Sequence, residues 1–281
     1  MTAGGLAPAI VLVGCGNMGG ALLAGWLDRG LAAGTILVIE PDAGLAEAAR
    51  ARGCAVGADR SALSPSRPPQ VIVLAVKPQV VDRLIGDYAD LVAAGAVLLS
   101  IAAGKTIARL TAGLRTAPDG GGLAVVRAMP NTPAAIRRGI TVACANDDTR
   151  ESQRALCEDL LAAVGSVLWV EDEALIDAVT AVSGSGPAYV FLFAECLGRA
   201  GVEAGLPEEM AHRLARETVA GAGELLARST QPAATLRRNV TSPGGTTAAA
   251  LAVLMAEEEG LQPLLNRAVT AAKQRSRELG S

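Results

Sequence analysis

A glycine-rich segment near the start of the chain, VLVGCGNMGG (residues 11–20), has a spacing that can bind a dinucleotide. Gly14, Gly16 and Gly19 form G-x-G-x-x-G after an apolar run and open the helix-like stretch MGGALLAGWLDRG. In this context the first glycine permits a tight turn, the second lets the backbone approach a pyrophosphate, and the third lets helix and strand pack closely. The N–H groups around Asn17 and Met18 would then face the phosphates. The alternative is a glycine-rich turn that holds no ligand.

The same segment contains Leu12-Val13-Gly14-Cys15, which looks like the box that is cleaved before a lipid-modified cysteine. Such a signal needs a basic segment followed by a removable apolar core. The preceding MTAGGLAPA contains no Lys or Arg, and cleavage before Cys15 would destroy the glycine pattern. We therefore favour the dinucleotide interpretation.

Other residues suited to a dinucleotide site lie where apolar runs end. Glu40 follows the glycines by about twenty residues, where an acidic side chain commonly accepts the ribose hydroxyls. The stretch LAVKPQ (74–79) ends another run, and its Lys77 can either meet the dinucleotide or remain a solvated loop lysine. Ala102 and Ala103 end a third run with small side chains that leave room for a flat ring.

A second candidate site lies in TSPGGTTAAALAVLMAEEE (241–259). Pro243 followed by two glycines predicts a turn, after which a helix begins. Backbone N–H groups and hydroxyls at a helix N-terminus attract anions, and this turn is too short for a nucleotide. A small carboxylate is the expected ligand. The alternative is that the turn is an ordinary helix cap that binds no ligand. The residues assigned to this carboxylate site are Ser242, Gly244, Gly245, Thr246 and Thr247.

The helical half lacks an obvious proton donor for a ketone. Enzymes that reduce C=O commonly use a Lys or His to protonate the nascent alkoxide. Between residues 171 and 281 the only lysine is Lys273, and the only histidine of the chain, His212, lies within a helix-like stretch where a packed or surface position is expected. An imine can arrive already protonated, so the sequence favours C=N reduction.

The order of apolar runs and helix-like stretches predicts an α/β protein with an N-terminal doubly wound (Rossmann) sheet. The expected strands are 9–14, 35–40, 70–76, 96–102, 123–129, 140–145 and 167–170, most of them continuous apolar runs typical of parallel strands. Helices are expected at 17–29, 43–52, 78–92 and 149–163. Beyond residue 171 they are expected at 172–204, with an interruption at SGSGP, and at 207–228, 246–258 and 260–279, with a short turn at 232–239. We thus expect a dinucleotide-binding domain over 1–170 and a helical substrate-binding and dimerisation domain over 171–281.

Composition excludes several classes of partner. Hydrophobic residues make up 51% and charged residues 19% of the 281 residues, so a sizeable core is available, and the formal charge of -3 argues against nucleic acid. The five cysteines show no metal-type spacing and fit a reducing cytoplasm. No uninterrupted apolar run reaches the roughly 18 residues of a spanning helix, so no membrane is expected. The apolar helices beyond residue 171 predict a homodimer through that half.

The motifs GCGNMGG, LAVKPQ, SIAAGKT, RAMPNTP, IDAVTAVSGSGPAYVF, AGLPEEMAHRLARET and NVTSPGGTTAAAL resemble those of pyrroline-5-carboxylate reductases, in the same order and over nearly the whole chain. The pair NVTSPGGTT and AVSGSGPAY is specific to that family, whereas G-x-G-x-x-G is not. The resemblance implies reduction of 1-pyrroline-5-carboxylate, a cyclic imine carboxylate, to L-proline by NADPH or NADH. It also implies dimers that can assemble into decamers.

The resemblance also assigns residues. It places Gly14 to Gly19, Ala75, Val76, Lys77, Pro78, Ala103, Asn131 and Asn239 near the cofactor, and it places Ser242, Gly245, Thr246, Thr247 and Glu173 near the substrate. Thr247 is the expected catalytic residue, since its hydroxyl can also reach the ring nitrogen. Glu40 departs from many NADPH-preferring relatives, which predicts that NADH is used at least as well as NADPH.

Two other functions fit the same architecture. One is a hydroxy-acid dehydrogenase or ketopantoate-type reductase, which the missing lysine in the helical half disfavours. The other is a non-catalytic dinucleotide-sensing protein, which the complete TSPGGTT turn disfavours, because a sensor needs no second anion site.

Overall fold

The computed structural model describes residues 9–63, 68–114 and 122–280, so most of the segment MTAGGLAPA lies outside the described residues. The chain forms two compact units. Unit 1 comprises Met1–Gly184 together with Lys273–Ser281, and unit 2 comprises Ser185–Ala272.

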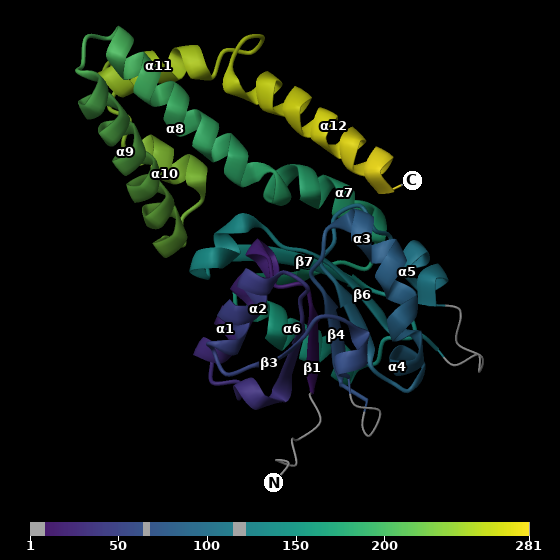
Figure 1. Ribbon diagram of the computed structural model, residues 1–281. Coiled ribbons are helices and arrows are strands. Elements are labelled where there is room, and N and C mark those ends of the chain that lie inside the picture. The colour runs from purple at the N-terminus through teal and green to yellow at the C-terminus, as the bar shows by residue number, and fades with distance from the viewer. Residues whose placement is uncertain (1–8, 64–67, 115–121, 281) are drawn as a thin grey trace. The chain divides into compact units, whose positions relative to one another are not determined.

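Unit 1 contains one eight-stranded sheet in the order β3-β2-β1-β4-β5-β6-β7-β8 (Figure 1). The strands are β1 Ile10–Val13, β2 Ile36–Ile39, β3 Ala55–Gly57, β4 Val71–Leu74, β5 Val97–Ser100, β6 Val125–Met129, β7 Gly139–Ala145 and β8 Gly165–Trp169. All seven expected strands are present. The short β3 was not predicted, and it pairs at the edge beside β2.

The sheet is doubly wound, as predicted, because alternate side chains of each strand enter two separate cores. Leu12 and Val38 pack with α1 (Asn17–Asp28) and α6 (Glu151–Ala162) on one face. Val13 and Ile39 pack on the other face, whose core also includes side chains from α3 (Pro78–Leu84), α4 (Ala89–Ala93) and α5 (Ile107–Leu114). Burial of both faces explains the continuous apolar runs of the sequence.

Three expectations for unit 1 need correction. Instead of one helix over 78–92, the structure has three consecutive elements: α3, a 3-10 turn over Ile85–Tyr88, and α4. The helix α5 was not predicted. The sheet is also not wholly parallel, since β7 runs antiparallel to β6 while β8 runs parallel to β7. The remaining helix before β3 is α2 (Ala43–Arg50), which agrees with the expected 43–52.

The entry to the helical half is irregular. A 3-10 turn at Glu173–Leu175 leads into α7 (Ile176–Val179) and then a π-helix at Thr180–Gly184. A single wide turn of this kind is often found beside functional sites. It accounts for the interruption that was expected at SGSGP.

Unit 2 is entirely helical. It contains α8 (Gly186–Glu203), α9 (Glu208–Arg228), α10 (Ala233–Asn239), α11 (Thr246–Leu254) and the first part of α12 (Leu261–Gly280). The chain folds back between α8 and α9 at Gly205, which has a φ of 98°. Close packing of these two helices depends on Gly198, because a Cβ atom there would lie 3.0 Å from Cε1 of His212.

One continuous helical segment, Glu173–Glu203, is long and apolar enough to cross a membrane by length and composition alone. Helices of soluble proteins pass the same test, so this single segment is weak evidence for a membrane span.

Candidate functional site

The glycine loop between β1 and α1 has the geometry that its spacing predicted. Gly14 has a φ of 91°, and a Cβ atom there would lie 2.8 Å from Val76 Cγ1 and 2.9 Å from the Ala75 carbonyl oxygen. A Cβ atom at Gly19 would collide with the carbonyl oxygen of Gly14. Both positions therefore exclude a side chain, one for the turn and one for close packing of helix on strand.

Gly16 differs from these two glycines. It has an ordinary φ of -66°, and, apart from its chain neighbours, no described residue places an atom within 4 Å of the Cβ position. It also caps α1 without any side-chain hydrogen bond, which leaves the first-turn N–H groups of Asn17, Met18 and Gly19 without a partner inside the helix. Space in front of Gly16 and free N–H donors together fit a pyrophosphate.

Glu40 lies beside this loop and is nearly inaccessible to water. Its Oε2 accepts the N–H of Cys15 at 2.7 Å, and its Oε1 accepts the N–H of Asp42 at 3.0 Å. The carboxylate thus fixes the glycine loop to the segment after β2. Because an ionised carboxylate has about four lone-pair directions, it can still accept hydroxyl groups.

A hollow of about 270 Å³ opens between α1 and α2 next to the glycine loop. Gly16, Asn17 and Leu45 line it, and Arg52 is the only cationic residue among its described lining residues. The two other nearby arginines are directed elsewhere: Arg60 donates to Asp90 at 2.9 Å, and Arg50 lies 3.4 Å from Glu47 on its own helix.

The loops after β4 and β5 lie at the carboxyl edge of the sheet, where ligands bind in such folds. Val76 packs against Gly14, while Lys77 is exposed and precedes the N-terminus of α3, with Pro78 as the first residue of that helix. Ala102 is buried and Ala103 is half-buried. The structure therefore gathers the residues predicted from LAVKPQ and SIAAGKT at one edge, near the glycine loop.

The sequence reasoning missed an ion cluster that joins α3 to the loop after β5 and to α5. Lys105 is buried, and its Nζ donates to both carboxylate oxygens of Asp82 on α3, at 2.9 and 2.8 Å. Arg109 donates to the same carboxylate at 2.9 Å. The hydrogen bond from Lys105 is the main cause that lowers the pKa of Asp82 below its ordinary value. The signal that the sequence offered for this cluster is Lys105, a basic residue that directly follows the small residues at the end of the strand.

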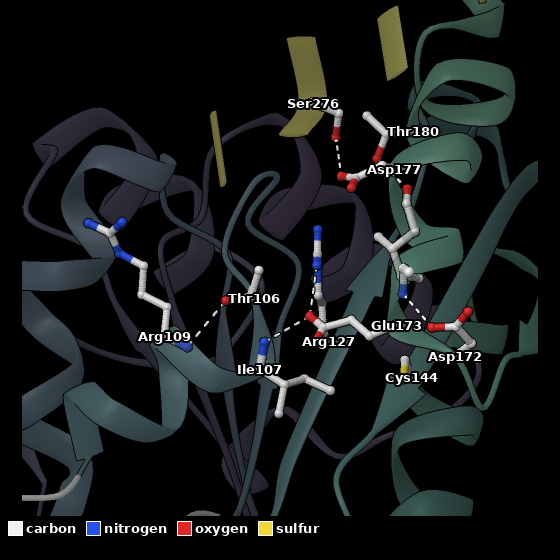
Figure 2. Close-up of polar contacts among 12 residues, drawn as sticks. Thr106, Ile107, Arg109, Arg127, Cys144, Asp172, Glu173, Asp177, Thr180 and Ser276 are labelled. Atoms are coloured by element: carbon white, nitrogen blue, oxygen red, sulfur yellow. Dashed lines mark hydrogen bonds and ion pairs between the residues drawn. The ribbon is translucent and has the colours of Figure 1, made fainter. Parts of the chain in front are cut away.

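Glu173 has a structural environment that the sequence did not reveal (Figure 2). Its Oε1 accepts from the guanidinium of Arg127 at 2.7 Å and from the backbone N–H of Ile107, the first residue of α5, at 2.8 Å. Arg127 lies inside the apolar strand β6 and is only 4% exposed. One carboxylate oxygen therefore joins the sheet, α5 and the start of the helical half.

Asn131 also has defined partners. Its Nδ2 donates to the Ser183 carbonyl in the π-helix at 3.1 Å, and its Oδ1 accepts the N–H of Ile140 at 2.9 Å. The side chain thereby links the segment after β6 to the π-helix within unit 1.

The turn before α11 has the shape expected of an anion site. Gly244 has a φ of 67°, and a Cβ atom at Gly245 would lie 2.5 Å from Ser242 Oγ. Gly245 caps α11 without a side-chain hydrogen bond, so the first N–H groups of the helix have no partner within it. The hydroxyls of Ser242, Thr246 and Thr247 make no hydrogen bond to any residue in the described part of the chain.

The predicted residues divide between the two units. Unit 1 holds the glycine loop, Glu40, residues 75–78, Ala102, Ala103, Asn131 and Glu173, whereas unit 2 holds Asn239, Ser242 and the segment 244–247. In unit 2 the Nδ2 of Asn239 donates to Gln231 at 3.2 Å. His212 packs on Gly198, as expected of a helix-packing residue, and Lys273 begins the part of α12 that belongs to unit 1.

Comparisons with known proteins match both parts of the chain. A family model described as pyrroline-5-carboxylate reductase dimerisation matches residues 173–279, and one described as NADP oxidoreductase, coenzyme F420-dependent, matches residues 9–104. A protein named pyrroline-5-carboxylate reductase from Pseudomonas aeruginosa is 41% identical, with 97% of each chain covered. The protein of the same name from Haemophilus influenzae is 37% identical, covering 96% of this chain and 97% of its own.

Solved structures give the same result. The pyrroline-5-carboxylate reductase of Coxiella burnetii superposes with a TM-score of 0.89 at 34% identity, covering 98% of this chain and 100% of the other. The pyrroline carboxylate reductase of Plasmodium falciparum, solved with NADP bound, superposes with a TM-score of 0.79 at 29% identity, covering 98% of both chains.

Proposed function

Because the chain belongs to the pyrroline-5-carboxylate reductase family, we propose that it reduces 1-pyrroline-5-carboxylate to L-proline, and that two of its helix N-termini bind the two ligands. The chain is accordingly an oxidoreductase of proline biosynthesis with a nicotinamide dinucleotide as hydride donor. The observation that carries the proposal is that two helices of the chain, α1 and α11, begin without a side-chain cap. The N-terminus of α1 lies beside the glycine loop, and that of α11 lies beside three hydroxyls that make no hydrogen bond to the described residues.

The first of these helix starts suits the dinucleotide. The open space at Gly16 and the N–H groups of Asn17 and Met18 would hold the pyrophosphate. Glu40 would receive the ribose hydroxyls, while Ala102 and Ala103 would leave room for the ring. When bound, the reduced nicotinamide supplies the hydride.

The second helix start suits a small carboxylate. The N–H groups of Thr246 and Thr247 and the Ser242 hydroxyl would bind the substrate carboxylate at the positive end of α11. The Thr247 hydroxyl oxygen would accept the N–H of the protonated imine, which orients the imine carbon. Hydride addition then converts the C=N bond to a C–N bond, and the proton already on nitrogen remains in the product amine. No enzymic acid is required.

We further propose a homodimer formed through the helical half and a cytoplasmic location. The match to a dimerisation family over residues 173–279 and the exposed apolar helices of unit 2 support the dimer. Assembly of dimers into decamers remains a prediction, which light scattering of the purified protein measures directly.

The test of the proposed function compares substrates in parallel. Oxidation of NADH and NADPH is followed with 1-pyrroline-5-carboxylate, with the 2-carboxylate isomer and with 2-keto acids. We expect kcat/KM to be highest for 1-pyrroline-5-carboxylate. Faster reduction of 2-keto acids would overturn the proposal in favour of a hydroxy-acid dehydrogenase.

Cofactor preference is a finer proposal, in which NADH is used at least as well as NADPH. A 2′-phosphate near Glu40 would meet a like charge, which costs about 1–2 kcal/mol near a protein surface, or roughly tenfold in affinity. Arg52 opposes this effect, since it lines the hollow beside the glycine loop. We expect Glu40→Ser to shift kcat/KM toward NADPH and Arg52→Gln to shift it toward NADH. Arg50→Gln is the matched control, because Arg50 pairs with Glu47. A wild type that strongly prefers NADPH, with no shift in Glu40→Ser, would contradict the role of Glu40.

A further inference from the structure

The loop between β5 and α5, residues 101–106, is held at three points within unit 1. Lys105 binds Asp82 on α3, and the N–H of Ile107, which follows the loop, donates to Glu173. The third point is Gly104, which lies against the last residues of α12. Two of the three contacts thus arise from segments more than sixty residues away in sequence.

The contact between Gly104 and α12 is made backbone to backbone. Gly104 has a φ of 73°, and a Cβ atom there would lie 3.1 Å from the Leu279 carbonyl oxygen and 3.3 Å from Leu279 Cβ. In the reverse direction, a Cβ atom at Gly280 would lie 3.2 Å from the Gly104 carbonyl oxygen. A glycine on each side allows this approach, so the end of α12 limits how far the loop can move toward it, and a shift of α12 toward the loop must displace the loop.

The end of α12 is itself anchored. Ser276 is only 5% exposed, and its hydroxyl donates to Asp177 Oδ1 at 2.7 Å (Figure 2). Arg277 Nε lies 3.8 Å from the other oxygen of the same carboxylate. Asp177 follows Glu173 by four residues, so one short helical segment holds both α12 and the start of α5.

We infer that the end of α12, residues 276–280, is a positioning element for hydride transfer, which acts by fixing the backbone of Ala102 and Ala103 through Gly104. This inference rests on the proposed function, in which these two alanines face the nicotinamide. Since their side chains are only methyl groups, the backbone of the loop determines how closely the ring can approach. A displacement of about 1 Å near reacting atoms can lower the rate on the order of a hundredfold.

The test uses the full-length enzyme and four variants, of which Asp177→Asn is the conservative one. Gly104→Ala introduces a methyl group against Leu279, and Ser276→Ala removes the anchoring hydrogen bond to Asp177. Gln274→Ala is the control, because Gln274 lies on the same helix, is exposed, and among the described residues hydrogen-bonds only to Glu278 of that helix. For each variant the kcat, both KM values, the thermal midpoint, and the primary isotope effect with deuterated NADH are measured.

We expect kcat to fall by about tenfold or more in Gly104→Ala and by about threefold in Ser276→Ala, with a larger isotope effect in both. The KM for 1-pyrroline-5-carboxylate should remain within about twofold of the wild-type value. Asp177→Asn should retain at least half of the kcat, because an amide oxygen still accepts the Ser276 hydroxyl.

Unchanged kcat and isotope effect in Ser276→Ala, with only a lower thermal midpoint, would show that the contact is merely structural and would overturn the inference. If Gly104→Ala does not fold, the kcat and isotope effect of Ser276→Ala alone decide whether the inference holds. Failure of the proposed function would give a different result from failure of this inference. In that case the wild type and Gln274→Ala would also be inactive with 1-pyrroline-5-carboxylate.

Discussion

In unit 1 the strands β1, β4 and β5 are almost inaccessible to water along their whole length, whereas in residues 185–272 the only buried apolar side chains are Ala211 and Ala215. Large apolar side chains of α8 and α11 are exposed instead, with Phe191 at 69% and Val253 at 73%. Exposed large apolar side chains in this number are typical of a protein interface. Unit 1 completes its own core, while unit 2 presents half of a core that we expect a second copy to complete.

The largest effect should come from a charge placed in the exposed apolar surface of unit 2. We expect Phe191→Asp to abolish the dimer and the activity together, because an unpaired charge buried in an interface costs about 3–5 kcal/mol and a twofold interface contains two copies. Sedimentation velocity measures the assembly, and turnover is measured at the same protein concentration.

Leu168→Asp provides the matched control, since Leu168 is also exposed, at 55%, but lies on β8 in unit 1. This variant should remain a dimer. A Phe191→Asp protein that still sediments as a fully active dimer would remove the proposed difference between the two units.

Within unit 1, the glycine loop allows fold stability and ligand binding to be separated. Gly14→Ala should lower the free energy of unfolding by at least 1–2 kcal/mol, because the left-handed backbone and the nearby Val76 both oppose a side chain. Gly16→Ala should leave the thermal midpoint nearly unchanged, since its Cβ position is open, yet weaken NADH binding about tenfold or more by occupying the space before the pyrophosphate. Calorimetric titration with NADH tests both variants. Equal losses of stability would contradict this separation.

In unit 2, the turn before α11 should contribute to turnover without contributing to the fold. Thr247→Ala should lower kcat/KM for the imine by about ten- to a hundredfold, equivalent to ~1–3 kcal/mol, because it leaves a substrate polar group unpaired. NADH affinity and helical content should stay the same. If kinetics were unchanged in the double variant Ser242→Ala/Thr247→Ala, the carboxylate site would have to lie elsewhere.

The features that could be predicted from the sequence are those that depend on residues close together in the chain. The glycine spacing together with an apolar run correctly predicted β1, the turn and α1. In contrast, β3 has three residues of which only Gly57 is buried, so no apolar run marks it. The antiparallel direction of β7 depends on pairing between strands, which a hydrophobic run does not specify.

The polar contacts that the sequence did not reveal are all distant in sequence. Arg127 and Glu173 are separated by 46 residues, and Lys105 and Asp82 by 23. Nothing in either local segment indicates its partner, because such pairs depend on the completed topology. The helix N-termini could be predicted, since the residues that form them are adjacent.

The smallest effect concerns alkaline pH, and it should be confined to unit 1. Burial raises the pKa of Tyr88 to about 12 and that of the Cys157 thiol to about 12, and both residues lie in the cores of unit 1. Because the folded protein holds these protons more tightly than the unfolded chain, their contribution is fully present below the unfolded pKa values, about 8.5 for Cys and 10 for Tyr. It is lost as the pH rises toward 12.

The tryptophans allow this loss to be assigned to a unit. Trp26 and Trp169, the two tryptophans of the chain, both lie in unit 1, so their fluorescence reports its unfolding, while far-ultraviolet circular dichroism also reports the helices of unit 2. We expect the urea midpoint by fluorescence to fall between pH 9 and pH 12. In Tyr88→Phe the free energy of unfolding should fall by roughly 1–2 kcal/mol less above pH 10 than in the wild type. At pH 8 the free energy of unfolding should change little. If Tyr88→Phe followed the wild-type curve up to pH 12, the Tyr88 hydroxyl would have to titrate in contact with water, and the closed core that distinguishes unit 1 from unit 2 would be open at that residue.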